Sequence, residues 1–249
     1  MRRFFVDPAA VTATTARLTG TEAHHLAEVL RLGPGTVVDL FDGCGTVYRA
    51  RVERVIRGEV ETTILASARQ SDGRPSLSMG VALLTGKKMD LVIQKATELG
   101  VDAIHPYIAR HCTVKERNEN KEERWQRIIL EACKQCNRPA PPECTPAADF
   151  TSILEAPPPS AIKIIFWERE HARTLADLLP TGTMVPAAVF ALCGPEGGFS
   201  VEEIDQAVSA GFTPVTLGDR ILRAETAVIA GAAILQYLLG NLAATPGRE

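Results

Sequence analysis

The first part of the chain alternates apolar and polar residues, which is the pattern of half-buried β-strands. In residues 46–56 the apolar positions would face a core, namely Tyr48, Ala50, Val52 and Ile56. The charged positions Arg49, Arg51 and Glu53 would face water. Further strands are predicted at residues 2–7, 36–41 and 59–68. A helix is predicted at 19–33, because Thr19 and Glu22 form a capping-box pair. This pattern predicts a small, mostly β barrel or sandwich over residues 1–72.

After a polar linker at 69–76, the rhythm changes to strands alternating with amphipathic helices. Strands are predicted at 77–84, 101–109, 161–167, 187–193 and 214–217. Helices are predicted at 87–100, 121–137, 173–179, 201–211 and 224–239. A proline-rich connection joins the second helix to the third strand. Such alternation is typical of a mostly parallel sheet covered on both faces, so residues 73–249 are expected to form a second, α/β domain.

Charge and cysteine content narrow the class of protein. The 249 residues have a formal net charge of -3 and a pI near 6.0, which argues against a protein that coats nucleic acid non-specifically. The six cysteines are scattered, and the lone CxxC of Cys133 and Cys136 has no second pair at ligand spacing. We therefore expect free thiols in the cytoplasm and no metal site. The apolar run at 227–239 is shorter than the roughly 20 residues that span a bilayer, and it indicates a buried helix.

The stretch GPEGGFS follows a predicted strand that ends at Cys193. Ser200 and Glu203 form a capping box for the next helix, so residues 194–198 are expected to form a tight loop at the carboxyl end of a strand. In open α/β sheets ligands bind at this position, and glycine lets them approach bare backbone. The spacing matches neither a dinucleotide fingerprint nor a P-loop, and Glu196 would repel phosphate. An uncharged or cationic ligand fits better, although a purely structural turn is an equally good interpretation of this loop alone.

A second stretch, TLGDRILRAETA at 216–227, repeats the arrangement of strand, glycine and helix. Two adjacent crossovers would bring both loops to the same edge of the sheet. Leu217, Ile221 and Leu222 could then line an apolar slot for a flat ring. Arg223 and Glu225 flank the most apolar helix, and charges in such places are paired or functional.

These motifs resemble those of a known family. GPEGGFS followed by LGDRILRAETA is similar to the signature of the SPOUT class of S-adenosylmethionine-dependent RNA methyltransferases. Within that class, RRFFV, HHLAEVLR, QKATELGV and EACKQCNRP resemble the small-subunit (16S) ribosomal RNA (uracil-N3) methyltransferases. The resemblance runs from about residue 2 to residue 240. Ala224, where threonine is expected, and Cys136, where serine is more usual, depart from the pattern.

The resemblance implies a PUA-like RNA-binding β barrel at 1–72 and a SPOUT methyltransferase domain with a trefoil knot at 73–249. It also implies a homodimer, with residues 224–239 partly in the interface, and ribosomal RNA or the small ribosomal subunit as partner. The implied cofactor is S-adenosyl-L-methionine. Carried over by motif, its site would consist of Leu192, Gly194, Glu196, Gly197, Gly198, Leu217, Gly218, Ile221, Leu222, Arg223 and Thr226.

Methylation of uracil N3 requires loss of a weakly acidic proton, so a base or a cation that stabilises the uracil anion would help. The catalytic candidates are Arg223, which we favour, and Glu225, followed by Lys95, Glu98, Gln135 and Arg138. A salt bridge from Arg223 to Glu225 or Glu196 is the alternative structural role. RNA contacts are expected from Arg2, Arg3, Arg49, Arg51, Arg54, Arg57, Lys88 and Arg138, with Lys87, Arg110 and Lys115 as further candidates. For any one of these, a solvated surface position is the simpler alternative.

Two other functions fit parts of the sequence. An RNA-binding assembly factor without catalysis would keep the arginines and lose the loops, but both loops look intact. An unrelated α/β enzyme that uses a nucleotide would need a phosphate-binding signature, which the chain lacks. Calorimetry with S-adenosylmethionine, NAD and ATP would separate the three functions.

Overall fold

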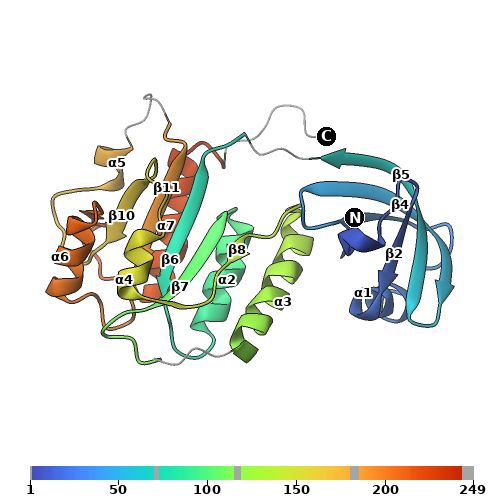
Figure 1. Cartoon of the computed structure of the whole chain (residues 1–249), viewed down its shortest axis with the longest axis horizontal. Helices are drawn as coiled ribbons and strands as arrows, with labels where there is room; N and C mark the ends of the chain where they lie inside the picture. Colours follow the sequence, from blue (N-terminus) through green and yellow to red (C-terminus); the bar gives the residue numbers. More distant parts are fainter. Residues whose placement is uncertain (1, 70–72, 115–118, 180–184, 243–249) are drawn as a thin grey trace. The chain divides into compact units, whose positions relative to one another are not determined.

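A computed structural model describes residues 2–69, 73–114, 119–179 and 185–242 (Figure 1). The chain divides into two compact units. The first contains Met1–Gly73 and Leu130–Pro141, and the second contains Arg74–Ile129 and Pro142–Glu249. The polar linker predicted at 69–76 falls at the main division, although its residues 70–72 lie outside the described chain.

The first unit contains a curled, barrel-like sheet in the strand order β1-β3-β4-β5-β2. Its strands are β1 (Arg3–Phe5), β2 (Thr15–Thr19), β3 (Val37–Phe41), β4 (Thr46–Ile56) and β5 (Glu59–Arg69). β1 pairs with β3 in parallel, and the other neighbours are antiparallel. A 3-10 turn η1 (Pro8–Ala10), the short helix α1 (Gly20–His24) and a π-helical turn η2 (His25–Val29) complete it. The predicted β barrel is confirmed.

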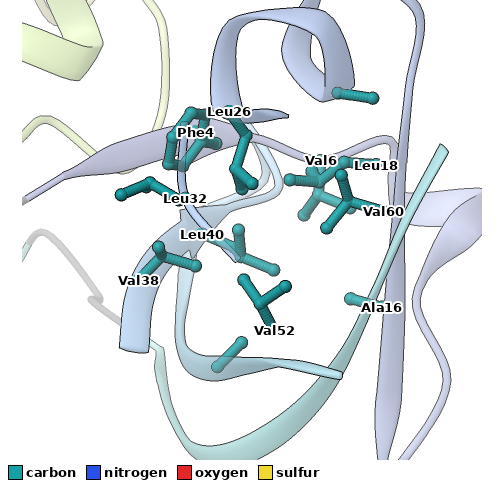
Figure 2. Packing of buried hydrophobic residues seen from close by; sticks show 12 residues of the cluster. Phe4, Val6, Ala16, Leu18, Leu26, Leu32, Val38, Leu40, Val52 and Val60 are labelled. Carbon is teal, nitrogen blue, oxygen red and sulfur yellow. The ribbon is translucent and has the colours of Figure 1, made fainter. Parts of the chain in front are cut away.

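The core of this unit is formed by the inward-facing residues of all five strands and the helical segment (Figure 2). Phe4, Leu18, Leu40 and Val52 come from four different strands, and Leu26 comes from η2. None of these side chains is more than 1% exposed. The alternation in the sequence places them there, because every second residue of a strand faces the same side of the sheet.

Two local predictions in this unit are wrong. Ile56 is 41% exposed, because the pairing of β4 with β5 shifts register between Val52 and Arg54 and moves the later residues off the inner face. Thr19 makes no side-chain cap to the helix, so the predicted capping box is absent. Glu22 instead accepts a hydrogen bond from the Phe5 backbone N–H and binds Lys134.

The second unit contains a seven-stranded sheet, in which all neighbours are parallel, as predicted. The order is β12-β10-β11-β6-β7-β8, and β9 also pairs with β7. The strands are β6 (Ser76–Ala82), β7 (Ala103–Ile108), β8 (Glu143–Cys144), β9 (Ala148–Asp149), β10 (Ile162–Phe166), β11 (Ala188–Cys193) and β12 (Thr213–Val215).

Helices flank this sheet (Figure 1). They are α2 (Lys88–Glu98), α3 (Glu119–Cys136), α4 (Phe150–Glu155), α5 (Leu175–Leu178), α6 (Val201–Ser209) and α7 (Ala224–Leu238). α7 packs on α2, β6 and β11, and α4 packs on β7 and β9. Gly231 allows the close approach of α7, since a Cβ there would lie 2.7 Å from the Phe166 ring. No described helix is long and apolar enough to cross a membrane.

Candidate active site

The parallel strands β10, β11 and β12 end side by side at Phe166, Cys193 and Val215, which are paired in register. The three loops that follow them, joined by Lys88 and the first turn of α7, enclose a pocket of about 480 Å³. The two loops predicted from the sequence therefore do meet at one edge of the sheet. This is the edge at which open α/β sheets bind ligands.

The glycine loop after β11 is tightly fitted to its surroundings. Gly198 has φ of +70°, and a Cβ there would lie 2.7 Å from Glu168 Oε1. A Cβ on Gly197 would lie 2.8 Å from the His111 Cβ. The imidazole Nδ1 of His111 is 3.1 Å from the Gly198 carbonyl oxygen. Glycine is thus required here by close packing as well as by backbone conformation.

Glu196 joins this loop to the turn between β6 and α2. Its Oε1 accepts hydrogen bonds from the Thr85 backbone N–H at 3.0 Å, from the Thr85 hydroxyl at 2.7 Å and from Lys88 Nζ at 2.9 Å. Burial opposes ionisation, but these hydrogen bonds outweigh it and lower the pKa of Glu196 to about 2. The Glu196 carboxylate is therefore hydrogen-bonded within the protein, whereas the sequence indicated a carboxylate that a ligand could contact.

Further hydrogen bonds fix the two ends of the glycine loop. The buried Tyr107 hydroxyl donates to the Cys193 carbonyl at 2.9 Å, where β11 ends. The predicted capping box is confirmed: Ser200 and Glu203 bond to each other's backbone N–H groups at the start of α6. The second oxygen of Glu203 accepts the Arg110 backbone N–H at 2.8 Å. The loop is consequently held in one conformation before any ligand arrives.

The loop after β12 has a more open structure. Gly218 has φ of +105°, and its N–H donates to the Thr216 hydroxyl at 3.1 Å. Ile221 is 86% exposed, and Leu217 and Leu222 are half-buried in the pocket wall. Exposed apolar side chains at a pocket mouth can cover a flat apolar ligand face.

Sequence reasoning missed the third loop, which follows β10. Phe166, Trp167, Glu168 and His171 all line the pocket. The loop has no glycine and no motif of the kind that marked the other two. Only the position of this loop could have revealed it, because it follows a strand, ending at Phe166, that the sequence placed within the same sheet.

Most of the predicted cofactor and catalytic residues line this one pocket. They are Gly194, Glu196, Gly197, Gly198, Leu217, Gly218, Ile221, Leu222, Arg223 and Glu225. Leu192 and Thr226 do not line it. Leu192 is buried within β11, where its side chain fills the space above Gly80, and Thr226 is exposed on α7. Lys95 and Glu98 form an ion pair with each other on α2, and Gln135 and Arg138 belong to the first unit.

The predicted RNA-binding residues have varied environments. Arg2, Arg49 and Arg57 are exposed, whereas Arg51 and Arg54 form ion pairs with Glu53 and Glu61. Arg3 is half-buried, with its guanidinium 4.9 Å from the centre of the Phe41 ring, and burial lowers its pKa. Lys88 pairs with Glu196, Arg110 with Glu202, and Arg138 is half-buried. Lys87 is exposed, and Lys115 lies outside the described residues.

Comparisons with known proteins agree with this architecture. A family model described as an RNA methyltransferase domain matches residues 72–236, and one described as an RNA methyltransferase PUA domain matches residues 18–65. Together, fold and pocket place the chain among SPOUT-class RNA methyltransferases with a PUA-like domain. The chain belongs to this RNA methyltransferase family. The trefoil knot stays a prediction.

Several relatives resemble the chain over nearly its whole length. The ribosomal RNA small subunit methyltransferase E of Synechocystis sp. is 33% identical over 95% of this chain and 78% of its own. The crystal structure of the same-named enzyme from Neisseria gonorrhoeae, bound to S-adenosyl methionine, has a TM-score of 0.85 and 34% identity, covering 96% of this chain and 98% of its own. A Legionella pneumophila methyltransferase with bound cofactor SAM has a TM-score of 0.85 and 31% identity, covering 95% and 97%.

Proposed function

We propose that this protein transfers a methyl group from S-adenosyl-L-methionine to N3 of a specific uridine in small-subunit (16S) ribosomal RNA, within the assembled subunit in the cytoplasm. The observation that carries the proposal is the pocket formed by the loops after β10, β11 and β12. Its glycine loop resembles the family signature, and two solved relatives contain the cofactor. The Synechocystis and Neisseria relatives support the choice of substrate, because both are named as methyltransferases of small-subunit ribosomal RNA.

The residues of the pocket fit this cofactor. Its volume of about 480 Å³ lies in the range of small-molecule sites. Gly194, Gly197 and Gly198 line the pocket, where glycine backbone lets a polar ligand edge approach closely. Leu217, Ile221 and Leu222 offer apolar surface for a purine ring. Acidic and basic side chains both line the walls, which suits a ligand that carries a sulfonium, an ammonium and a carboxylate group: Lys88, Glu168, Asp219, Arg220 and Arg223.

When bound, the cofactor supplies an electrophilic methyl group, and the protein mainly supplies position. The glycine loop would hold the cofactor at the edge of the sheet. The hydrogen bonds from Thr85 to Glu196 would keep this loop in place. Arg223 is exposed at the pocket wall, where its guanidinium could stabilise negative charge on the uracil ring. Thr226, on the exposed surface of α7, and Leu192, within β11, would act only through their neighbours. The target uridine must be unpaired, because base pairing occupies N3.

The barrel-like unit would dock the RNA. Arg2, Arg49 and Arg57 are exposed and form no ion pair among the described residues, so they are the first candidates for phosphate contacts. Arg51 and Arg54 could join them after exchanging Glu53 and Glu61 for phosphate. Arg3, Lys88 and Arg138 are weaker candidates, because each is half-buried.

A homodimer is also part of the proposal. Ile234 and Tyr237 on α7 are 41% and 70% exposed, and Ala230 and Ala233 lie on the same side of the helix at helical spacing. An apolar stripe of this kind is typical of a subunit interface.

The test begins with calorimetry of the purified protein with S-adenosylmethionine, NAD and ATP, and binding of only NAD or ATP would reject the proposal. Tritiated methyl transfer to small subunits and to free ribosomal RNA, followed by mass spectrometry of the nucleosides, then identifies the product. We expect 3-methyluridine, formed faster on subunits. Cofactor binding without any methyl transfer would favour the RNA-binding assembly factor.

A further inference from the structure

Two buried polar atoms at the pocket have no hydrogen-bond partner among the described residues: Glu225 Oε2 and Trp167 Nε1. Glu225 lies in the first turn of α7, and Trp167 directly follows β10. A buried polar atom without a partner costs free energy, so native proteins rarely leave one unless a ligand, water or partner completes it. Both residues line the pocket while these two atoms are shielded from water, so a side-chain rotation would present a ligand with one unfilled acceptor and one unfilled donor.

Other charged groups at the pocket are already engaged or reach water. Glu196 is bonded to Thr85 and Lys88. Glu168 and Arg223 are exposed, and the ion pair that the sequence allowed between Arg223 and Glu225 or Glu196 is not formed among the described residues. Glu225 is consequently the carboxylate at the pocket with a buried oxygen that accepts no hydrogen bond from the described chain.

We infer that Glu225 is the catalytic base that accepts the N3 proton of the target uridine, and that Trp167 donates a hydrogen bond to a carbonyl oxygen beside N3. This inference rests on the proposed function. The imide edge of uracil presents an N–H between two carbonyl groups, which matches an acceptor and a donor. Cytosine has no proton at N3, so its lone pair would face the carboxylate. A buried acceptor left unpaired rejects the wrong base strongly.

The chemical step balances with these groups. As the N3–C bond to the methyl group forms, the bond between methyl and sulfonium sulfur breaks, and its electron pair stays on sulfur. The N3 proton passes to the Glu225 carboxylate, which is only partly buried, and then to solvent. Arg223 is left to stabilise charge on the ring oxygens. Proton transfer to a positioned carboxylate typically contributes about 10²- to 10⁴-fold to a rate.

The first experiment compares Glu225→Gln with Glu155→Gln, a matched change at an exposed glutamate that ends α4. We expect kcat for 3-methyluridine formation to fall at least about 100-fold in Glu225→Gln, with the calorimetric Kd for S-adenosylmethionine within about twofold of the parent. Glu155→Gln should match the parent in both.

A chemical rescue separates a base from a merely structural carboxylate. The loss in Glu225→Gln should shrink at higher pH and with RNA that contains 5-fluorouridine, because in both cases the N3 proton leaves without help. The parent profile is measured alongside, since Lys88, Glu168, His171, Glu196, Asp219, Arg220 and Arg223 also line the pocket. A loss that is independent of pH and of the fluorine, or activity within about threefold of the parent, would overturn the role of Glu225.

Trp167→Phe tests the donor, because it keeps an aromatic ring and removes the N–H. We expect kcat/KM for RNA to fall about tenfold, with cofactor binding unchanged. An unchanged kcat/KM would show that Trp167 does not contact the substrate. If the parent enzyme makes a methylated nucleoside other than 3-methyluridine, the proposed function fails, and this outcome is independent of either variant.

Discussion

Glu196 illustrates how a motif residue can act through another part of the chain. Its carboxylate faces the turn at Thr85 and Lys88, so its effect on a ligand passes through the shape of the glycine loop. We expect Glu196→Gln to weaken S-adenosylmethionine binding about tenfold and to lower the free energy of unfolding by about 1–2 kcal/mol. Calorimetry and urea unfolding measure both. Glu202→Gln, which breaks an exposed ion pair to Arg110, should change the affinity and the stability much less.

The contribution of Glu196 to stability should also depend on pH. The pKa of the folded protein, about 2, lies below the ordinary value of 4.5. The stabilisation is therefore complete above the ordinary value and is lost as pH falls through the folded value. The difference in stability between the parent and Glu196→Gln should narrow below pH 4.5 and vanish near pH 2. A constant difference over this range would show that the hydrogen bonds to Thr85 and Lys88 do not stabilise the carboxylate.

Gly197 has a structural role that the sequence alone did not reveal. From sequence, Gly197→Val should abolish cofactor binding without affecting folding. In the structure, even Gly197→Ala places a Cβ 2.8 Å from the His111 Cβ and 3.3 Å from its carbonyl oxygen. We expect Gly197→Ala to weaken cofactor binding and also to cost about 1–3 kcal/mol of stability. Gly33→Ala, whose Cβ meets nothing within 4 Å, is the control. Normal stability of Gly197→Ala would mean that the His111 segment moves freely.

Sequence reasoning found the two glycine loops because glycine spacing and a capping box mark them locally. It could not find Trp167 and Glu168, since nothing near them in sequence distinguishes a pocket residue from a surface one. It also could not find the ion pair of Lys88 with Glu196, because the two residues are more than a hundred positions apart in the chain. Contacts of this length depend on the order of the strands, which periodicity does not determine.

At the scale of elements, the long strands and helices were predictable and the short or irregular ones were not. β6, β7, β10 and β11 are apolar runs, and α2 buries Met89, Val92, Ile93 and Ala96 as its periodicity indicated. β8 and β9 have two residues each, too few for any periodic signal. α4 was missed within the proline-rich connection, although Asp149 caps it by accepting the Ser152 N–H at 2.7 Å.

Helix α7 carries the prediction about assembly. Ile234 and Tyr237 are exposed on this helix, whose opposite face is buried. We expect a dimer in solution, and Tyr237→Asp combined with Ile234→Asp should convert it to a monomer, because two charges would enter an apolar interface. Light scattering at micromolar concentration measures the mass. Val208→Asp, at a 49% exposed position on α6, is the matched control and should remain dimeric. A monomeric parent protein would contradict the prediction.

At the scale of the whole molecule, the change from alternating strands to strands and amphipathic helices predicted two units. It did not predict that a later segment of the chain belongs to the first unit. Leu130–Pro141, at the end of α3 and just beyond, belongs to the first unit, where Lys134 binds Glu22. Sequence patterns assign this stretch to the α/β domain, because α3 is one continuous amphipathic helix. A fragment that begins at Arg74 would therefore lose partners of this segment, and substitutions in the full-length chain are the better test of the barrel.

The barrel arginines provide that test, because they differ in their ion pairs. Arg49 and Arg57 are exposed without ion pairs among the described residues, whereas Arg51 and Arg54 face Glu53 and Glu61. If the barrel docks RNA through phosphates, Arg49→Ala with Arg57→Ala should reduce the slope of log affinity against log salt by about 2, or about 1 per lost contact. Arg51→Ala with Arg54→Ala should reduce it less, since these charges are partly neutralised before RNA binds. Filter binding and tritiated methyl transfer across a salt series measure both pairs, with cofactor affinity as the control that should not change. Equal slopes for the parent and for Arg49→Ala with Arg57→Ala would show that the barrel does not bind RNA through these residues, and its role would then lie in stability or assembly.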